Sequence, residues 1–299
     1  MNNTRRNKSK KKVLNKNKSQ KKQRCSPNLN KNNFSCMTNN TLFKLRDKWN
    51  LRHPDVKIIT NEPKEIWEQM NKKMNGICYQ ESCWLKQHFT GGELEYEMNK
   101  TFAPKAPKGW KLNPTEWLSS EDITNVMLQY EKAYKCFNFI GPSPIDYDAR
   151  LAYGECVWDE LCHFNLQEQI NNKIKKIGII FNLDPHYKGG SHWVSMFINI
   201  EKGYIMYFDS GGDLIPKQLM KFANNIIKQG INLSKPIHFI FDQNHPKQHQ
   251  RFDTECGMYS LYFIIHMLKD KHTKDYFKTH TIPDKKMEEF RKIYFNDDL

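Results

Sequence analysis

The 299-residue sequence predicts an α+β fold, in which a mixed β-sheet packs against a buried helix and a helical accessory region comes first. Apolar runs of strand length lie between residues 175 and 241, and turn residues bound them. Residues 257–269 read GMYSLYFIIHMLK, a helix that is apolar all round and is therefore expected to be buried. Residues 41–135 carry helix patterns separated by loops.

Helix signals divide the accessory region, residues 41–135. Pro63 suits the first turn of a helix, because its fixed φ is compatible with that position. Ser119 and Ser120 are good residues to begin another helix, since their hydroxyl groups accept hydrogen bonds from the first free N–H groups. The predicted helices cover residues 63–70, 78–89 and 123–134.

The predicted sheet falls within residues 136–299, which we assign as the catalytic region. Two β-rich runs flank the tight turn Glu201-Lys-Gly203, and this arrangement predicts a hairpin. Pro216 near the start and Gly230 just past the end mark a helix between them. The predicted strands cover 175–183, 192–200, 204–209 and 236–241, and the predicted helices cover 216–228, 257–269 and 285–294.

Basic charge is concentrated in residues 1–40. This segment holds twelve Lys and Arg and no acidic residue, so removing it from the net charge of +14 leaves +2 for the rest. Its Asn/Lys/Ser-rich composition cannot bury enough apolar surface to offset the entropy of ordering, and we expect a disordered tail. The tail is either a solubilising extension or a contact for nucleic acid or another acidic surface. No apolar stretch of membrane-spanning length and no targeting pattern is present, so no membrane association is expected.

The eight cysteines are expected to be reduced thiols, because the chain is long and carries no secretory signal. Cys156 is followed by Cys162 and His163, but paired C-x-x-C knuckles are missing. We therefore expect no metal site and no cofactor.

One cysteine has the setting of a nucleophile. Cys256 lies where a polar loop becomes the buried helix, and a helix N-terminus stabilises the reactive thiolate. His192 opens one strand of the predicted hairpin and Asp209 closes the other, which should place them at one sheet edge. That pairing suits a carboxylate that orients an imidazole base.

The loop before Cys256 offers several candidates for two further roles. A side-chain amide could help the backbone N–H of Cys256 to stabilise an oxyanion. Spacing leaves the choice open among Gln243, Gln248 and Gln250, and it leaves His245 and His249 as rival bases.

These motifs resemble the clan of papain-like cysteine peptidases that contains adenovirus-type endopeptidases and ubiquitin-like-protein proteases. The resemblance covers residues 137–270 and is closest to polyprotein-processing proteases of large DNA viruses. It rests on His192-Trp193, Asp209-Ser210, Gln250, Cys256-Gly257 and the segment 141–148. It implies His192 as base, Asp209 as orienting acid, Cys256 as nucleophile, Gln250 as oxyanion donor and Trp193 as a cleft-shaping side chain. Thr254-Glu255 departs from the Asp that precedes the cysteine in many ubiquitin-like-protein proteases.

The resemblance also implies a function. We expect a thiol endopeptidase that cleaves after small residues, at Gly-Gly-type sites, and matures viral polyproteins or structural proteins in the virion and host cytoplasm. One alternative is a deubiquitinase or ubiquitin-like-protein peptidase that acts on host conjugates. Another is a basic nucleic-acid-binding virion protein on an inactive peptidase scaffold.

Overall fold

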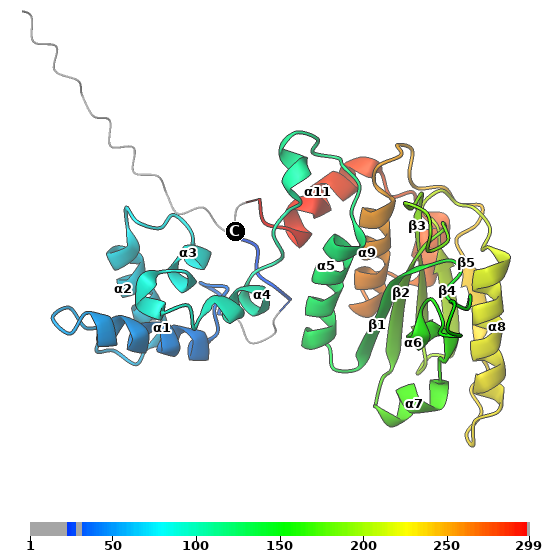
Figure 1. Ribbon diagram of the computed structural model, residues 1–299, viewed down its shortest axis with the longest axis horizontal. Coiled ribbons are helices and arrows are strands. Elements are labelled where there is room, and N and C mark those ends of the chain that lie inside the picture. Colours follow the sequence, from blue (N-terminus) through cyan, green and yellow to red (C-terminus); the bar gives the residue numbers. More distant parts are fainter. Residues whose placement is uncertain (1–22, 28–31, 298–299) are drawn as a thin grey trace, which may run out of the picture.

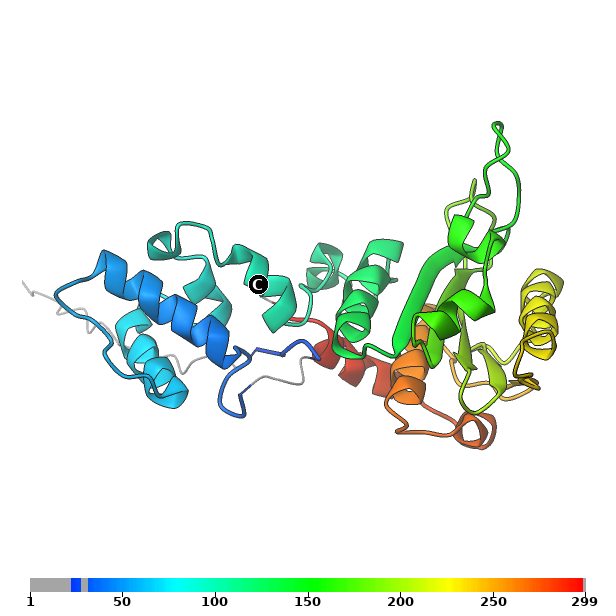
Figure 2. The same cartoon turned by 90° about the horizontal axis from the view of Figure 1, so that it is seen from below.

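The computed structural model describes residues 23–27 and 32–297, which form two lobes (Figure 1). One lobe is helical, and the other contains a sheet with helices on both faces. Figure 2 shows the two lobes next to each other along the long axis of the molecule. The helical lobe contains α1 (Asn39–Arg52), α2 (Pro63–Met74), α3 (Glu81–Leu85), η1 (His88–Thr90), η2 (Glu95–Glu97) and α4 (Met98–Thr101), and η3 (Lys108–Lys111) follows it.

The helical lobe has its own hydrophobic core, which includes Met37, Ile66 and Trp84. Residues before position 40 take part in this lobe. Cys25 forms a β-bridge with Phe102, and Met37 is fully buried. The expectation of a disordered tail over residues 1–40 therefore does not hold for 23–27 and 32–40. The remainder of that tail lies outside the described residues.

The sheet lobe contains one five-stranded sheet in the order β1-β2-β3-β4-β5. β1 runs parallel to β2 and β4 runs parallel to β5, whereas β2, β3 and β4 are antiparallel neighbours, so the sheet is mixed. The predicted α+β fold with a mixed sheet is confirmed, and so is the hairpin, which is β3 and β4. The strands are β1 (Phe137–Pro144), β2 (Lys176–Asn182), β3 (Trp193–Asn199), β4 (Tyr204–Phe208) and β5 (Ile240–Gln243).

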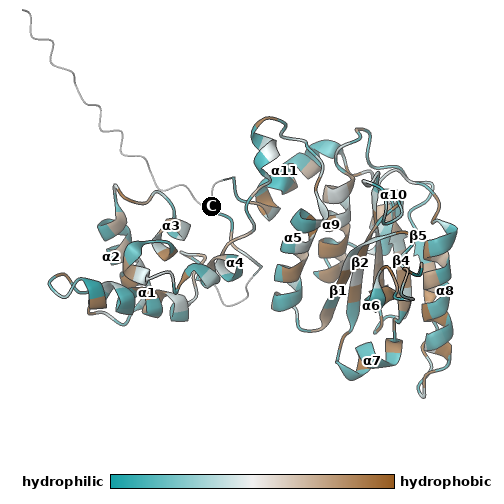
Figure 3. Cartoon of the chain, viewed as in Figure 1, coloured by the Kyte–Doolittle hydropathy of each residue, from teal (hydrophilic) through white to brown (hydrophobic). Residues whose placement is uncertain are grey.

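Alternate side chains of the central strands serve two different cores. Phe197 and Phe208 belong to the core on the face covered by α9. Ile198 and Tyr207 belong to the core on the face covered by α8, as expected for a strand period of two. Figure 3 shows hydrophobic residues concentrated in the sheet and α9, with hydrophilic residues on the outside of α8. The helices of this lobe are α5 (Ser120–Ala133), α6 (Asp159–Cys162), α7 (Leu166–Asn171), α8 (Lys217–Ile231), α9 (Cys256–Leu268), α10 (Lys274–Thr279) and α11 (Asp284–Tyr294).

Helix α5 belongs to the sheet lobe by its packing. Ser119 caps it, and the side chain of Asp122 completes a capping box. Its residues Val126 and Met127 lie in the same core as α9. The helical accessory region that the sequence analysis extended to residue 135 is thus divided, because α5 covers the sheet.

Six of the eight cysteines are paired as Cys25–Cys36, Cys78–Cys83 and Cys156–Cys162. Cys136 and Cys256 are free. The expectation of reduced thiols is wrong for the six paired residues. Each pair is only 5 to 11 residues apart in sequence, and the intervening turns bring the Cα atoms within 5.0–6.2 Å, which is bridging distance. Within residues 23–27 and 32–297, no helix combines the length and hydrophobicity that crossing a membrane requires.

Candidate active site

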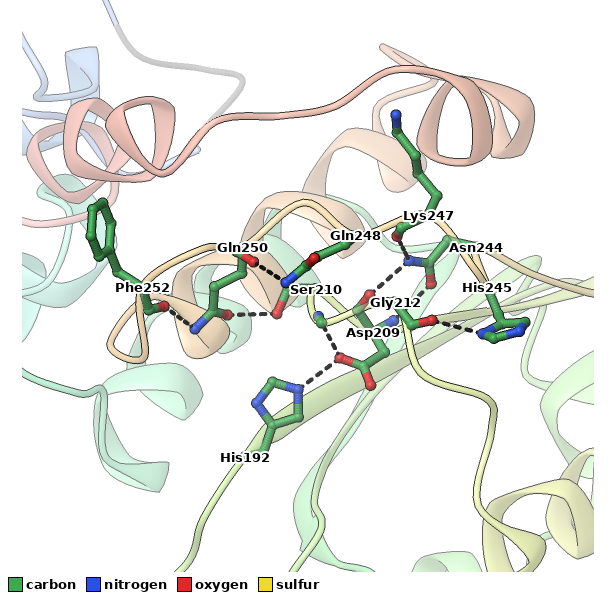
Figure 4. Close-up of polar contacts among 11 residues, drawn as sticks. His192, Asp209, Ser210, Gly212, Asn244, His245, Lys247, Gln248, Gln250 and Phe252 are labelled. Atoms are coloured by element: carbon green, nitrogen blue, oxygen red, sulfur yellow. Dashed lines mark hydrogen bonds and ion pairs between the residues drawn. The ribbon is translucent and has the colours of Figure 1, made fainter.

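The hairpin brings His192 and Asp209 together. His192 directly precedes β3 and Asp209 directly follows β4, and the two strands pair up to Ser195 and Phe208. The His192 Nε2 atom lies 2.7 Å from the Asp209 Oδ1 atom (Figure 4). The sequence-based expectation that these two side chains share one sheet edge is met. Because Nε2 bonds to the carboxylate, Nδ1 is the ring nitrogen that remains for another partner.

Asp209 is 1% exposed and is held on several sides. Its Oδ1 atom also accepts a hydrogen bond from the Gly211 N–H at 2.8 Å. The fully buried Asn244 accepts from the Asp209 N–H at 2.9 Å and donates to the Asp209 carbonyl at 2.7 Å (Figure 4). Sequence reasoning missed Asn244, because a lone Asn in a polar loop carries no pattern that assigns it a distant partner.

Cys256 is the first residue of α9 and is 1% exposed. Its thiol lies close enough to His192 to influence the ionisation of the imidazole, which relates the helix tip to the hairpin edge. Burial acts to lower the pKa of His192, but hydrogen bonds and charges from Asp209 and Cys256 outweigh it and raise that pKa to about 10. The imidazole is therefore protonated at neutral pH, which is the state that stabilises a neighbouring thiolate.

Trp193 and Leu118 pack against the start of α9. The Trp193 Nε1–H donates to the Leu118 carbonyl at 3.0 Å, and both side chains are buried. A Cβ atom at Gly257 would lie 3.0 Å from the Leu118 Cβ and 3.3 Å from the Trp193 Cδ1. Glycine at this position therefore lets the helix tip approach the wall that Trp193 and Leu118 form.

Gln250 is held with its amide group in a defined orientation. Its Nε2 atom donates to the Phe252 carbonyl, which can only accept, and its Oε1 atom accepts from the Ser210 hydroxyl at 2.7 Å (Figure 4). One N–H of the amide remains for another acceptor. The other two candidate glutamines are used elsewhere. Gln248 donates to the Gln250 carbonyl, and Gln243 accepts from the Ile215 N–H.

The rival histidines of the loop have structural partners. The buried His249 contacts the Phe277 carbonyl through Nε2 and accepts from the Ile282 N–H through Nδ1. Burial lowers the pKa of His249 to about 4, so it is neutral at pH 7. His245 contacts the Gly212 carbonyl through Nδ1. Both rivals are thus engaged with backbone carbonyls, whereas His192 interacts with the Cys256 thiol.

Glu255, which precedes the thiol, forms a buried ion pair with Arg291 of α11. The Arg291 Nε atom lies 3.0 Å from Glu255 Oε2, and both side chains are at most 4% exposed. Arg291 also donates to the carbonyls of Glu116 and Thr115. Glu255, which stands where many ubiquitin-like-protein proteases have Asp, thus has its counter-ion on α11. Sequence reasoning could not find this pair, because its members lie 36 residues apart.

Cys156, Cys162 and His163 form the one cluster of potential metal ligands found in the described part of the chain. Their ligand atoms lie within 4.8 Å of one another. The two sulfur atoms are bonded to each other, so neither is a free thiolate that could bind a cation.

Residues 121–299 match the Ulp1 protease family, C-terminal catalytic domain. The chain belongs to the Ulp1 protease family. A protein named as a thiol protease of Acanthamoeba polyphaga mimivirus is 30% identical over 266 residues, which are 85% of this chain and 82% of the relative. A cysteine protease of African swine fever virus is 24% identical over 243 residues, 78% of this chain and 88% of the relative.

A solved structure agrees with the architecture described above. The crystal structure of the African swine fever virus protease aligns with a TM-score of 0.62 at 19% identity, and it covers 91% of this chain and 95% of that one. At this identity the likeness shows the fold. Membership of the Ulp1 family and the named viral relatives make the chain a cysteine protease similar to those of large DNA viruses.

Proposed function

We propose that this chain is a thiol endopeptidase with Cys256 as nucleophile, His192 as proton-transfer group and Asp209 as the acid that orients it. The observation that carries the proposal is the hydrogen bond between the buried Asp209 carboxylate and the His192 ring, whose ionisation the thiol at the start of α9 also influences. The Gln250 amide and the backbone N–H of Cys256 are the proposed oxyanion donors.

The reaction follows from these positions. The Cys256 thiolate attacks the peptide carbonyl carbon, and negative charge develops on the carbonyl oxygen, where the two donors stabilise it. His192 gives its proton to the departing amine, and a thioester remains. Water, deprotonated by the now neutral His192, then attacks the thioester carbonyl, the C–S bond breaks to release the carboxylic acid, and the thiolate and imidazolium are restored.

We propose that the substrate is cut after small residues, at Gly-Gly-type sites in viral polyproteins or structural proteins. Support comes from the close packing at the helix tip, where Gly257 lies against Leu118 and Trp193. We propose Trp193 as the side chain that shapes the cleft. A virion and host-cytoplasm location is proposed from the viral relatives.

A second candidate is a peptidase for ubiquitin-like conjugates. It is favoured because some African swine fever virus relatives carry the name SUMO-1 cysteine protease. The chemistry of the two candidates is the same, so a comparison of substrates separates them. The third reading, an inactive scaffold, is disfavoured by the linked Asp209, His192 and Cys256 side chains.

The test combines peptide cleavage with thiol labelling. In a glycine-rich peptide library, we expect Cys256→Ala and His192→Ala to lower the rate by more than about 10³. Cys136→Ala is the matched control, since Cys136 is the other free thiol of the described chain, and its activity should equal that of the wild type. Iodoacetamide should label Cys256 faster than Cys136. Equal labelling of Cys256 and Cys136, or peptide cleavage by Cys256→Ala, would contradict the proposal and favour an inactive scaffold.

We further propose that the basic segment 1–22 contacts nucleic acid. It contains ten Lys and Arg and no acidic residue. Contacts of this kind neutralise phosphates without reading sequence.

A further inference from the structure

The turn that follows β4 holds two polar side chains with different partners. Asp209 faces His192, as described above, and Ser210 faces Gln250 (Figure 4). Ser210 is 1% exposed, and its hydroxyl donates to the Gln250 Oε1 atom at 2.7 Å. The Ser210 carbonyl accepts the N–H groups of His249 and Gln250, both at 2.9 Å. Three hydrogen bonds thus join Ser210 to the loop segment that contains His249 and Gln250.

The Ser210 hydroxyl acts as a hydrogen-bond donor to the side-chain amide of Gln250. The Gln250 Nε2 atom must face the Phe252 carbonyl, because that oxygen can only accept. The Oε1 atom then faces Ser210 and needs a donor, since a buried carbonyl without one is costly. Without the hydroxyl, the Phe252 carbonyl alone would hold the amide, and its free N–H would be less firmly fixed toward the position proposed for the oxyanion.

We infer that Ser210 is a positioning residue that fixes the donor face of Gln250 and couples it to the turn that holds Asp209. The inference rests on the proposed peptidase function. It follows that the adjacent residues Asp209 and Ser210 have separate roles. Asp209 acts on the thiolate–imidazolium pair, and Ser210 acts on oxyanion stabilisation alone.

Two reactions of Cys256 separate these roles. Alkylation by iodoacetamide requires the thiolate but forms no oxyanion, whereas hydrolysis of a peptide ending in Gly-Gly-aminomethylcoumarin requires both. Ser210→Ala should lower kcat for hydrolysis about tenfold, the loss that matches one neutral hydrogen bond, and leave KM within about twofold. The alkylation rate at pH 7 should stay within about twofold of the wild type. Asp209→Ala should lower both rates.

A double-mutant cycle tests whether Ser210 works through Gln250. Gln250→Ala alone should lower kcat more than Ser210→Ala does, because it removes the donor itself. Adding Ser210→Ala to Gln250→Ala should then have almost no further effect. Ser195→Ala is the matched control, since Ser195 is fully buried on β3 and its hydroxyl has no hydrogen-bond partner among the described residues. It should keep wild-type kcat.

Several outcomes would overturn the inference. These are unchanged kcat in Ser210→Ala, an equal fall in alkylation, or full additivity with Gln250→Ala. If Ser210→Ala does not fold, the same comparison is made between Ser210→Thr and Ser210→Val, which differ by a hydroxyl and a methyl group. If the wild type neither hydrolyses the peptide nor labels at Cys256, the proposed function fails as well, and this result is distinct from the others.

Discussion

His192 lies between two groups of the proposed active site, because its ring bonds to the Asp209 carboxylate and interacts with the Cys256 thiol. Its position at the start of a predicted strand, with Asp209 at the end of the next, was sufficient to predict that the two would meet. Spacing did not distinguish Gln250 from Gln243 and Gln248, and the resemblance made that choice. Asn244 could not be predicted, because its partner Asp209 lies 35 residues away and no local pattern connects them.

We predict that hydrolysis continues to a higher pH than the ordinary pKa of a histidine would allow. The pKa of His192 is raised from an ordinary 6.5 to about 10. The protonated imidazole therefore stabilises the folded protein fully below about pH 6.5, and this stabilisation is lost as the pH rises through about 10. Loss of the imidazolium over the same range should end hydrolysis. Asp209→Asn removes one cause of the raised pKa, so its alkaline limb should lie at lower pH.

The measurement is a pH–rate profile of kcat/KM for both proteins. Asp146→Asn is a matched control, because Asp146 forms a comparable pair with His186 at 2.7 Å and lies outside the proposed triad. It should keep the wild-type limb. An identical alkaline limb in the wild type and Asp209→Asn would contradict this account of His192.

At the scale of elements, strong patterns were predictable and weak ones were not. The hairpin and α9 followed from alternation and from an unbroken apolar run. Strand β1 was not predicted, since its sequence FNFIGPSP contains Gly and two Pro residues that argue against a strand. Strand β5 begins at Ile240 instead of residue 236, because the apolar Ile237 and Phe239 pack against the core without pairing with β4.

The tip of α9 is closely packed at Gly257, where little room remains for a side chain. Gly257→Ala should push Cys256 away from Leu118 and Trp193, because a Cβ atom there meets buried side chains at 3.0–3.3 Å. We expect a loss of about 1–3 kcal/mol in the free energy of unfolding, the usual cost of overpacking, and a fall in kcat/KM.

Thermal or urea unfolding and peptide hydrolysis measure the two effects. Gly189→Ala is the control, because a Cβ atom at that exposed glycine meets nothing within 4 Å. Its stability and activity should match the wild type. A fully stable and active Gly257→Ala would show that the helix tip has more room than the structure indicates.

For the whole molecule, the distribution of charge could be predicted from the sequence, whereas the disulfide pairs could not. The concentration of basic residues before position 40 is plain in the sequence. Composition could not show that residues 23–27 and 32–40 join the helical lobe, because their contacts are with distant residues such as Phe102 and Asn296. Pairing of Cys156 with Cys162 depends equally on the loop fold.

The basic segment 1–22 is expected to bind DNA and to be dispensable for folding. Deleting residues 1–22, and not 1–40, should preserve the fold and peptide hydrolysis but abolish salt-dependent DNA binding. For the full chain, affinity should fall by about 10³–10⁵ between 50 and 200 mM salt if six to ten phosphates are contacted. Fluorescence anisotropy with two unrelated DNA duplexes measures this. Binding that is insensitive to salt, or that survives the deletion, would contradict the role of the tail.

The buried side chain of Asn296 has a consequence for how the two lobes stay joined. It accepts from the Arg24 N–H and donates to the carbonyls of Arg24 and Ala103, so three remote parts of the chain meet at one amide. A protease that nicks the connection near residue 113 would therefore leave the lobes attached through Arg24 and Asn296. Separation of the fragments should require denaturant, and dilution alone should not release them.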